Sequence, residues 1–323
     1  MTREHRRSIG PGVLGVRKFT GIRLGAVPER TLTRVGTSEG EPRAPDGTLA
    51  DMTTTLPDHV RTILFNRVPE VTFAFWVIKI LSTTTGETFA DYLNVDLGLG
   101  LSITTWFMSA LLVIALVAQF STKRYNSGVY WTVVVLISIV GTLITDNLTD
   151  VLGVELWVST LIFSVVLAVT FGIWFYRERT LSIHTIFTRR REAFYWIAIL
   201  FTFALGTAAG DLISEGLGLG YLFGTILFAS LIGIIAIARF AFKANVVFCF
   251  WAAYILTRPL GASIGDLLSQ SPADGGLGIG ATATSVVFLV IIIGVATYLG
   301  IKVRRQRADA LASTAGSLAL VAP

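Results

Sequence analysis

The sequence is poor in the residues that soluble enzymes most often use for redox chemistry and metal binding. It contains one cysteine, Cys249, so no disulfide can form within the chain and no cysteine-based zinc site can be built. Its three histidines, His5, His59 and His184, all fall in polar segments, which removes the commonest transition-metal ligand from the apolar runs. A site within those runs must therefore use oxygen ligands.

Charge is also scarce. Charged residues make up 15% of the 323 residues and apolar residues 53%, and the mean hydropathy is +0.70. These values lie far from those of soluble globular domains and predict a polytopic membrane protein. The net charge of +5 does not indicate nucleic-acid binding, because the basic residues are spread among short connections between apolar runs. We expect the lipid bilayer as a partner, and neither a nucleic acid nor a cofactor.

Eight apolar runs are long enough to cross about 30 Å of hydrocarbon as helices. They cover residues 71–90, 99–119, 129–146, 156–176, 193–211, 219–239, 245–264 and 281–301. The connections between them alternate in charge: one set holds arginines and lysines, and the other set has none. The second set consists of residues 92–98, 147–155, 212–218 and 267–280. By the positive-inside rule we expect a plasma-membrane protein with both termini in the cytoplasm.

The regions outside these runs differ in composition. Residues 1–65 are rich in Arg, Gly, Pro and Thr and lack apolar periodicity, which predicts a disordered cytoplasmic tail. Met52 would be a plausible alternative start, just ahead of the first helix. Residues 306–323 are expected to form a second, unstructured tail. The domain between the tails, residues 66–305, holds all eight predicted helices.

One motif occurs four times in the apolar region. Each copy has a tryptophan that follows Phe or Tyr, a glycine ten residues later, and an aspartate five residues after the glycine. The residues are Trp76, Trp131, Trp196 and Trp251; Gly86, Gly141, Gly206 and Gly261; and Asp91, Asp146, Asp211 and Asp266. Each copy belongs to a two-helix unit, at about residues 70–120, 125–177, 190–240 and 245–303. The sequence therefore predicts an all-α bundle of four parallel repeats, with pseudo-symmetry about the membrane normal.

The fourfold motif is similar to that of a known family of membrane proteins. Together with "VPEVTFAFWVIKIL" at the first helix and "ILTRPLGASIGD" in the seventh, it resembles a bacterial family of membrane proteins built from four tandem two-helix repeats. The resemblance covers about residues 66–305. That family is a repeat of unknown function, so the resemblance implies the fold and no particular activity.

The repeated residues have plain structural interpretations. Tryptophans at the start of a membrane helix are typical of rings anchored at the membrane interface. Glycines are typical of close packing between helices. Each aspartate lies fifteen residues after its tryptophan, about 22 Å along the helix. This places it near the extracytoplasmic end, where it could be an ordinary solvated acid.

The helical spacing favours a shared polar centre. Steps of four residues back from each aspartate follow one face of its helix. The residues on these faces are Glu87, Thr83 and Lys79 in the first copy, Thr142 and Ser138 in the second, Thr207 in the third, and Arg258 with Tyr254 in the fourth. A charged side chain in hydrocarbon costs roughly 2.5 to 3.5 kcal/mol, so these faces should contact protein or water. If they converge, the four aspartates and Glu87 outnumber the two counter-charges, Lys79 and Arg258, which favours a bound cation.

Three functions remain open. The leading hypothesis is a secondary transporter or exchanger of a small inorganic cation or proton, held by the carboxylates, since hard cations prefer oxygen ligands. The alternative is a scaffold or sensor whose charged residues specify helix packing, which closed ion pairs between Lys79 or Arg258 and the acids would favour. The third is an intramembrane aspartyl hydrolase, which is less favoured because its GxGD motif is replaced by "AAGD" and "SIGD". No Ser-His, Cys-His or HExxH arrangement is found, so the chain is not expected to be an enzyme.

Overall fold

The structure is a computed structural model that describes residues 65–321. The predicted cytoplasmic tail, residues 1–65, lies outside the described residues apart from Phe65. The chain divides into two units, residues 1–48 and 49–323. Everything described below belongs to the second unit.

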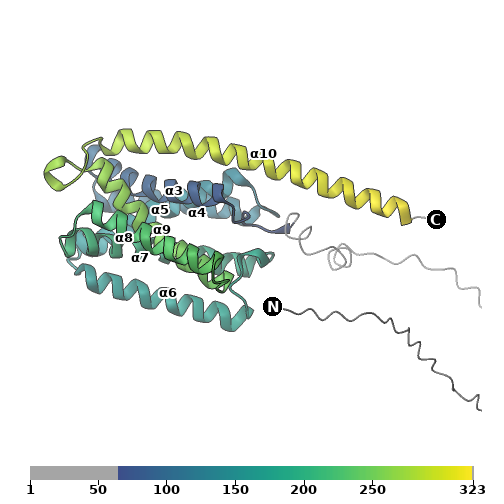
Figure 1. Cartoon of the computed structure of the whole chain (residues 1–323). Coiled ribbons are helices and arrows are strands. Elements are labelled where there is room, and N and C mark those ends of the chain that lie inside the picture. Colours follow the sequence, from purple (N-terminus) through teal and green to yellow (C-terminus); the bar gives the residue numbers. More distant parts are fainter. Residues whose placement is uncertain (1–64, 322–323) are drawn as a thin grey trace, which may run out of the picture. The chain divides into compact units, whose positions relative to one another are not determined.

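Eight long helices account for most of the described residues. They are α3 (Phe73–Asp91), α4 (Leu101–Ser121), α5 (Ser127–Asp146), α6 (Leu156–Glu178), α7 (Arg189–Asp211), α8 (Tyr221–Phe240), α9 (Val246–Ser269) and α10 (Ala281–Val321) (Figure 1). Short π-helical turns, η1 (Tyr92–Asp96), η2 (Asn147–Val151) and η4 (Leu212–Gly216), follow α3, α5 and α7. The connections also hold two 3-10 turns, η3 (Ile183–Thr185) and η5 (Pro272–Asp274). Residues 65–321 contain no strand, so the predicted all-α class is confirmed.

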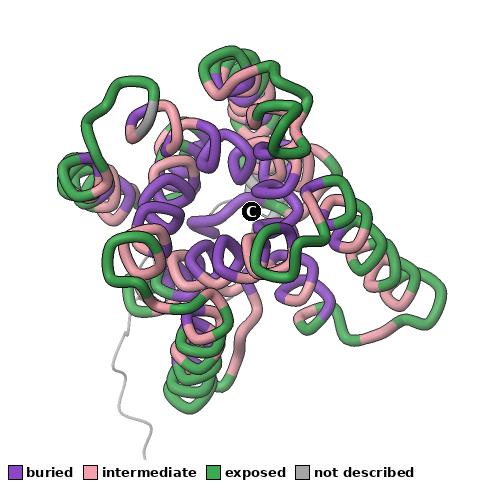
Figure 2. Tube along the Cα trace, turned by 90° about the vertical axis from the view of Figure 1, so that its left-hand side faces the viewer, coloured by how far each residue is buried: buried purple, intermediate pink, exposed green. Residues whose placement is uncertain are grey.

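The helices form an inner and an outer layer. α3, α5, α7 and α9 pack in a closed ring, in which each helix contacts two others, and α4, α6, α8 and α10 lie outside it. Figure 2 looks along the bundle and shows buried helices around the centre and exposed ones at the periphery. Each outer helix packs mainly on the inner helix of the following repeat: α4 on α5, α6 on α7, α8 on α9, and α10 on α3. The fourth repeat thus closes on the first, which confirms the predicted pseudo-symmetric arrangement.

Seven of the eight helices are long and apolar enough to cross a membrane. The exception is α3, which carries Lys79, Glu87 and Asp91 within 19 residues. This helix packs against α5, α9 and α10, so its charged face contacts protein. The outer helices show the opposite pattern, because between 11% and 22% of their apolar windows is buried within the protein, against 56% to 67% for α5, α7 and α9. The inner ring, with the polar side chains that it carries, is therefore covered by an apolar second layer.

Four glycines of the motif fix how closely the inner helices approach. A Cβ atom added at Gly86 would lie 1.8 Å from Ser138 Oγ, and one added at Gly261 would lie 1.9 Å from Thr83 Oγ1. The corresponding distance is 2.3 Å between Gly206 and Arg258 Cγ, and 2.6 Å between Gly141 and Phe203 Cβ. Each contacted residue stands three positions before the glycine of the neighbouring helix. The same contact is thus repeated around the ring, and a larger residue at any of the four glycines would push two inner helices apart.

The last helix is longer than predicted. We expected a helix that ends at residue 301 and an unstructured tail over residues 306–323, but α10 continues to Val321 (Figure 1). The segment "ADALASTAGSLALV" is rich in alanine and leucine, which have high helix propensity. No proline interrupts the chain between Pro272 and Pro323. Local propensity therefore extends the helix beyond its apolar part.

Candidate functional site

Polar side chains from all four inner helices meet inside the ring. Thr83 of α3, Ser138 and Thr142 of α5, and Thr207 of α7 have no exposed surface. Since these residues lie on the same helical face as the motif aspartates, the structure turns the four predicted stripes toward one another. The centre of the bundle is therefore polar, although the surrounding layer is apolar.

Arg258 connects these side chains. From α9, its guanidinium donates hydrogen bonds to Glu87 at 2.5 Å and to the backbone oxygen of Thr83 at 3.3 Å, both on α3. It also donates to Thr207 at 2.6 Å and to Thr142, which in turn donates to Glu87 at 3.2 Å. Both partners of the ion pair are buried. The arginine of the fourth repeat thus contacts all three of the other inner helices.

Three carboxylates gather next to this network. Glu87, Asp211 of α7 and Asp266 of α9 each place one oxygen within 4.8 Å of the others. Glu87 and Asp266 are buried, and Asp211 is half-buried. Oxygens at this spacing could contact one hard cation, which takes carboxylate ligands at about 2.0 to 2.6 Å. The all-oxygen donor set fits Mg²⁺, Ca²⁺ or Mn²⁺ better than copper or zinc.

The other two motif aspartates stand close to this group without joining it. Asp91 and Asp146 are the last residues of α3 and α5, and both are half-buried. Their carboxylates are near enough to Glu87 for the charges to interact. The structure therefore collects all five predicted acids at one end of the inner ring, but only three of them form the candidate cation site.

Lys79 is the second buried cation of the ring, and its environment differs from that of Arg258. Its side chain is 1% exposed, and its ammonium group has no hydrogen-bond partner. The nitrogen lies 4.1 Å from the ring centroid of Phe203 and 4.4 Å from that of Tyr254. Cation–π attraction replaces part of the lost hydration. Of the two predicted counter-charges, Arg258 is paired with an acid, whereas Lys79 takes part in none of the ion pairs among the described residues.

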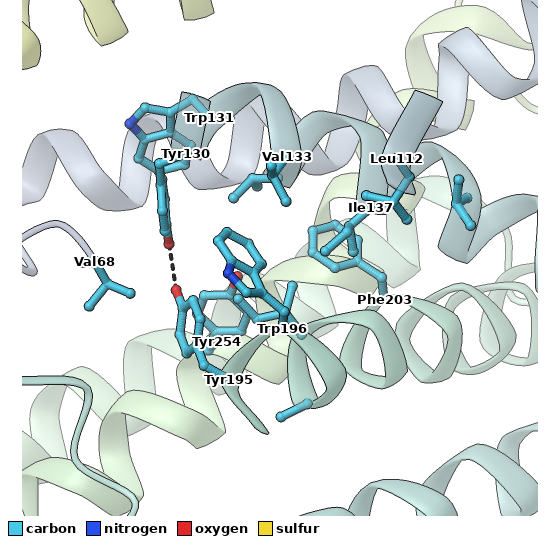
Figure 3. Close-up of a cluster of buried hydrophobic side chains, with 14 of the residues drawn as sticks. Val68, Leu112, Tyr130, Trp131, Val133, Ile137, Tyr195, Trp196, Phe203 and Tyr254 are labelled. Atoms are coloured by element: carbon cyan, nitrogen blue, oxygen red, sulfur yellow. Dashed lines mark hydrogen bonds between the residues drawn. The ribbon is translucent and has the colours of Figure 1, made fainter. Parts of the chain in front are cut away.

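Aromatic side chains fill the ring on the opposite side of Lys79 from the carboxylates. Phe75, Tyr130, Tyr195 and Phe250 directly precede the motif tryptophans, and all four are buried together with Tyr254. The hydroxyl oxygens of Tyr130 and Tyr195 lie 2.5 Å apart in a hydrogen bond (Figure 3). This end of the ring is the one where the arginine- and lysine-bearing connections lie, and we call it the basic end.

The segment before α3 closes the basic end further. Asn66, Arg67 and Val68 are buried, and Val68 belongs to the same hydrophobic cluster as the tyrosines (Figure 3). Arg67 pairs with Glu192 at 2.5 Å, and Gln119 donates to the same carboxylate at 2.8 Å. Sequence reasoning missed this plug, Asn66–Val68. One signal was available, because Glu192 is an acid directly after three arginines in "RRRE".

The motif tryptophans do not all lie where they were predicted. They were expected at the membrane interface, but Trp131, Trp196 and Trp251 are buried inside the bundle and only Trp76 is half-buried. Trp251 donates from its ring nitrogen to the backbone oxygen of Leu181 at 3.0 Å and packs against aromatic rings of α6. Trp131 and Trp196 pack against aromatic rings of the inner helices. A large ring that fills a gap in the core is stabilised by burial of its surface.

Comparison with known proteins concerns the repeated unit. A family model described as Repeat of Unknown Function (DUF347) matches residues 74–125, 129–180, 194–245 and 249–305. The four matches correspond to the four two-helix repeats and together cover more than half of the chain. No curated protein and no solved structure matches the sequence.

Proposed function

We propose that this chain, which belongs to the Repeat of Unknown Function (DUF347) family, is a secondary transporter or exchanger of a small inorganic cation. The observation that carries the proposal is the approach of carboxylate oxygens of Glu87, Asp211 and Asp266 to within 4.8 Å of one another, toward the end of the inner ring opposite the basic end. Clustered acids inside membrane proteins mark ion paths and proton relays, because isolated charges there are costly. The carboxylates would bind the cation, or protons exchanged for it.

The difference between the two ends of the ring supports this proposal. Toward the basic end, the buried tyrosines and the plug, Asn66–Val68, fill the ring. At the other end, Asp91, Asp146 and Asp211 are half-buried, so part of each side chain is exposed. In the plasma membrane, with the basic end and both termini in the cytoplasm, as the positive-inside rule indicates, the carboxylates would be reached from outside and sealed from inside. A carrier with alternating access needs one such state.

The pairing of Arg258 fits a role in the transport cycle. Its guanidinium neutralises Glu87 through the 2.5 Å contact, so part of the negative charge of the site is balanced when no cation is bound. A cation that binds Glu87 would compete with this contact. Binding and release would then be coupled to a rearrangement of Arg258 and of the threonine hydroxyls that it contacts on α5 and α7.

A scaffold or sensor is the second candidate. The closed ion pair between Arg258 and Glu87 is the feature that a packing role predicts. Lys79 argues against a purely structural role, because a buried ammonium group without a hydrogen-bond partner lowers stability. We therefore favour transport over packing alone.

The proposal can be tested with purified protein in liposomes. We expect a gradient of one cation among Mg²⁺, Ca²⁺, Mn²⁺ and Na⁺, or a pH gradient, to drive flux that empty liposomes lack. The variants Asp211→Asn and Asp266→Asn should each reduce this flux at least tenfold. Asp150→Asn is the matched control, because Asp150 is an exposed acid on the same side of the bundle.

Two outcomes would contradict the proposal. One is flux that persists unchanged when Asp91, Asp146, Asp211 and Asp266 are all replaced by asparagine. The other is a folded wild-type protein that moves none of these ions in either direction. The second outcome would favour the scaffold or sensor.

A further inference from the structure

A long crevice opens on the outer surface at the seam where the fourth repeat closes on the first. Its walls are α4 and α10, and its floor is formed by α3 and α5. The volume is about 1510 Å³, which exceeds the roughly 300 to 1,000 Å³ of a site for a drug-sized molecule. We call it the α4–α10 crevice.

The α4–α10 crevice has the length and the apolar lining that lipid chains require. Its lining residues on α10 extend from Leu289 to Leu311, about 33 Å at 1.5 Å per residue. The part that precedes the first arginine, from Leu289 to Val303, spans about 21 Å. This is more than half of the hydrocarbon core of a bilayer, about 30 Å thick, so it is long enough for the acyl chains of one leaflet. Phe107 and Leu111 of α4 and Ile293 of α10 are among the exposed apolar side chains that line it.

One end of the crevice is strongly basic. Lys123, Arg124, Arg304 and Arg307 line it, and none of its lining residues is acidic. Lys123, Arg124 and Arg304 are exposed, and Arg307 donates a hydrogen bond to the backbone oxygen of Tyr125 at 3.1 Å. The basic residues come from both walls, the connection after α4 and the helix α10. A ligand that they bind would therefore hold the two walls together.

We propose that the α4–α10 crevice binds an anionic phospholipid of the surrounding bilayer. The acyl chains lie along α4 and α10, and the phosphate lies between Lys123, Arg124 and Arg304. Guanidinium groups bind phosphate oxygens through paired hydrogen bonds, and basic pockets between membrane helices on the cytoplasmic side suit anionic headgroups. A free phosphate ion would use only the basic end and leave the apolar length of the crevice unexplained. The inference is independent of cation transport.

Native mass spectrometry of the full chain in detergent tests this site. Phosphatidylglycerol and phosphatidylcholine with the same acyl chains are titrated separately, and the fraction of protein that retains one lipid is measured. We expect the wild type to prefer phosphatidylglycerol at least tenfold, since each basic residue near the headgroup adds to the attraction. The variant Lys123→Gln/Arg124→Gln/Arg304→Gln should reduce the preference to less than threefold.

A matched control separates this site from the general effect of positive charge. Lys302, Arg305 and Lys243 are exposed residues of the same end of the bundle that do not line the crevice. Their replacement by glutamine should leave the preference intact. A separate variant, Ile293→Trp, should fill the apolar part and weaken binding of both lipids. Equal retention of the two lipids by the wild type, or equal loss of preference in the control and the crevice variant, would overturn the proposal.

Discussion

Removal of the guanidinium group of Arg258 should destabilise the inner ring strongly. The variant Arg258→Met keeps a long side chain and removes the charge. It leaves Glu87, which is 6% exposed, with the hydrogen bond from Thr142 but without its ion-pair partner. Loss of one partner of a buried pair costs about 3 to 5 kcal/mol, because the remaining charge is desolvated and unpaired. We expect a decrease of this size in the free energy of unfolding.

A second substitution should recover much of this loss. In the double variant Arg258→Met/Glu87→Gln no charge is stranded, and a buried pair replaced by neutral groups is often no less stable than the original. We expect the double variant to regain about 2 kcal/mol or more of what Arg258→Met loses. The control is Arg190→Met, which removes one of the two basic partners of Glu178 and leaves the other, Arg191, at 2.7 Å. The side chain of Arg190 is 63% exposed, so the expected loss is below about 1 kcal/mol.

The free energy of unfolding can be measured by titration of the protein from mild micelles into dodecyl sulfate, followed by tryptophan fluorescence. A chelator in the buffer keeps cations from contributing through the carboxylates. The reasoning is refuted if Arg258→Met costs no more than Arg190→Met. It is also refuted if the effects of Arg258→Met and Glu87→Gln are additive, since additive effects would mean that the two side chains do not stabilise each other.

Two further predictions concern packing and orientation. Gly206→Ala would place a methyl group 2.3 Å from an arginine side chain of α9 and should cost about 1 to 3 kcal/mol of unfolding free energy. The control is Gly233→Ala on α8, where nothing lies within 4 Å of the added methyl group, and it should be neutral or stabilising by up to about 1 kcal/mol. Equal effects of the two variants in the same titration would contradict the close packing at Gly206. In a Cys249→Ser background, Asp150→Cys should react with a membrane-impermeant thiol reagent in intact cells, whereas Lys123→Cys should react only after lysis. The reverse pattern would invert the proposed orientation.

The architecture could be predicted because two periodicities reinforce each other. The spacing of Trp, Gly and Asp identified four equivalent units, and steps of four residues from each aspartate identified the face that turns inward. The predicted run 129–146, for example, corresponds to α5 at Ser127–Asp146. The boundaries were less certain where hydropathy and helix propensity disagree, as at the end of α10. There the apolar run stops, but the local sequence still favours a helix.

The pairing inside the ring could not be predicted from the sequence. Arg258 contacts Glu87, a residue 171 positions away, because α9 and α3 become neighbours only when the fourth repeat closes on the first. Lys79 has no such partner, since it lies among the aromatic rings of Phe203 and Tyr254. The motif tryptophans were assigned to the interface because the sequence does not show which face of a helix end the outer layer covers. Phe203 was missed although it occupies the same repeat position as Thr83, Ser138 and Arg258.

Each outer helix packs on the inner helix of the next repeat, and this arrangement limits how such a chain can arise by duplication. A single hairpin of this kind is not self-sufficient, because its second helix packs against an inner helix that it does not itself provide. A chain of half this length would leave one outer helix without a surface to cover, and a second identical chain would supply that surface and complete the circle. Fusion of two such chains would retain every contact within the ring. It would also allow a single arginine or lysine in one copy to break the equivalence of the four.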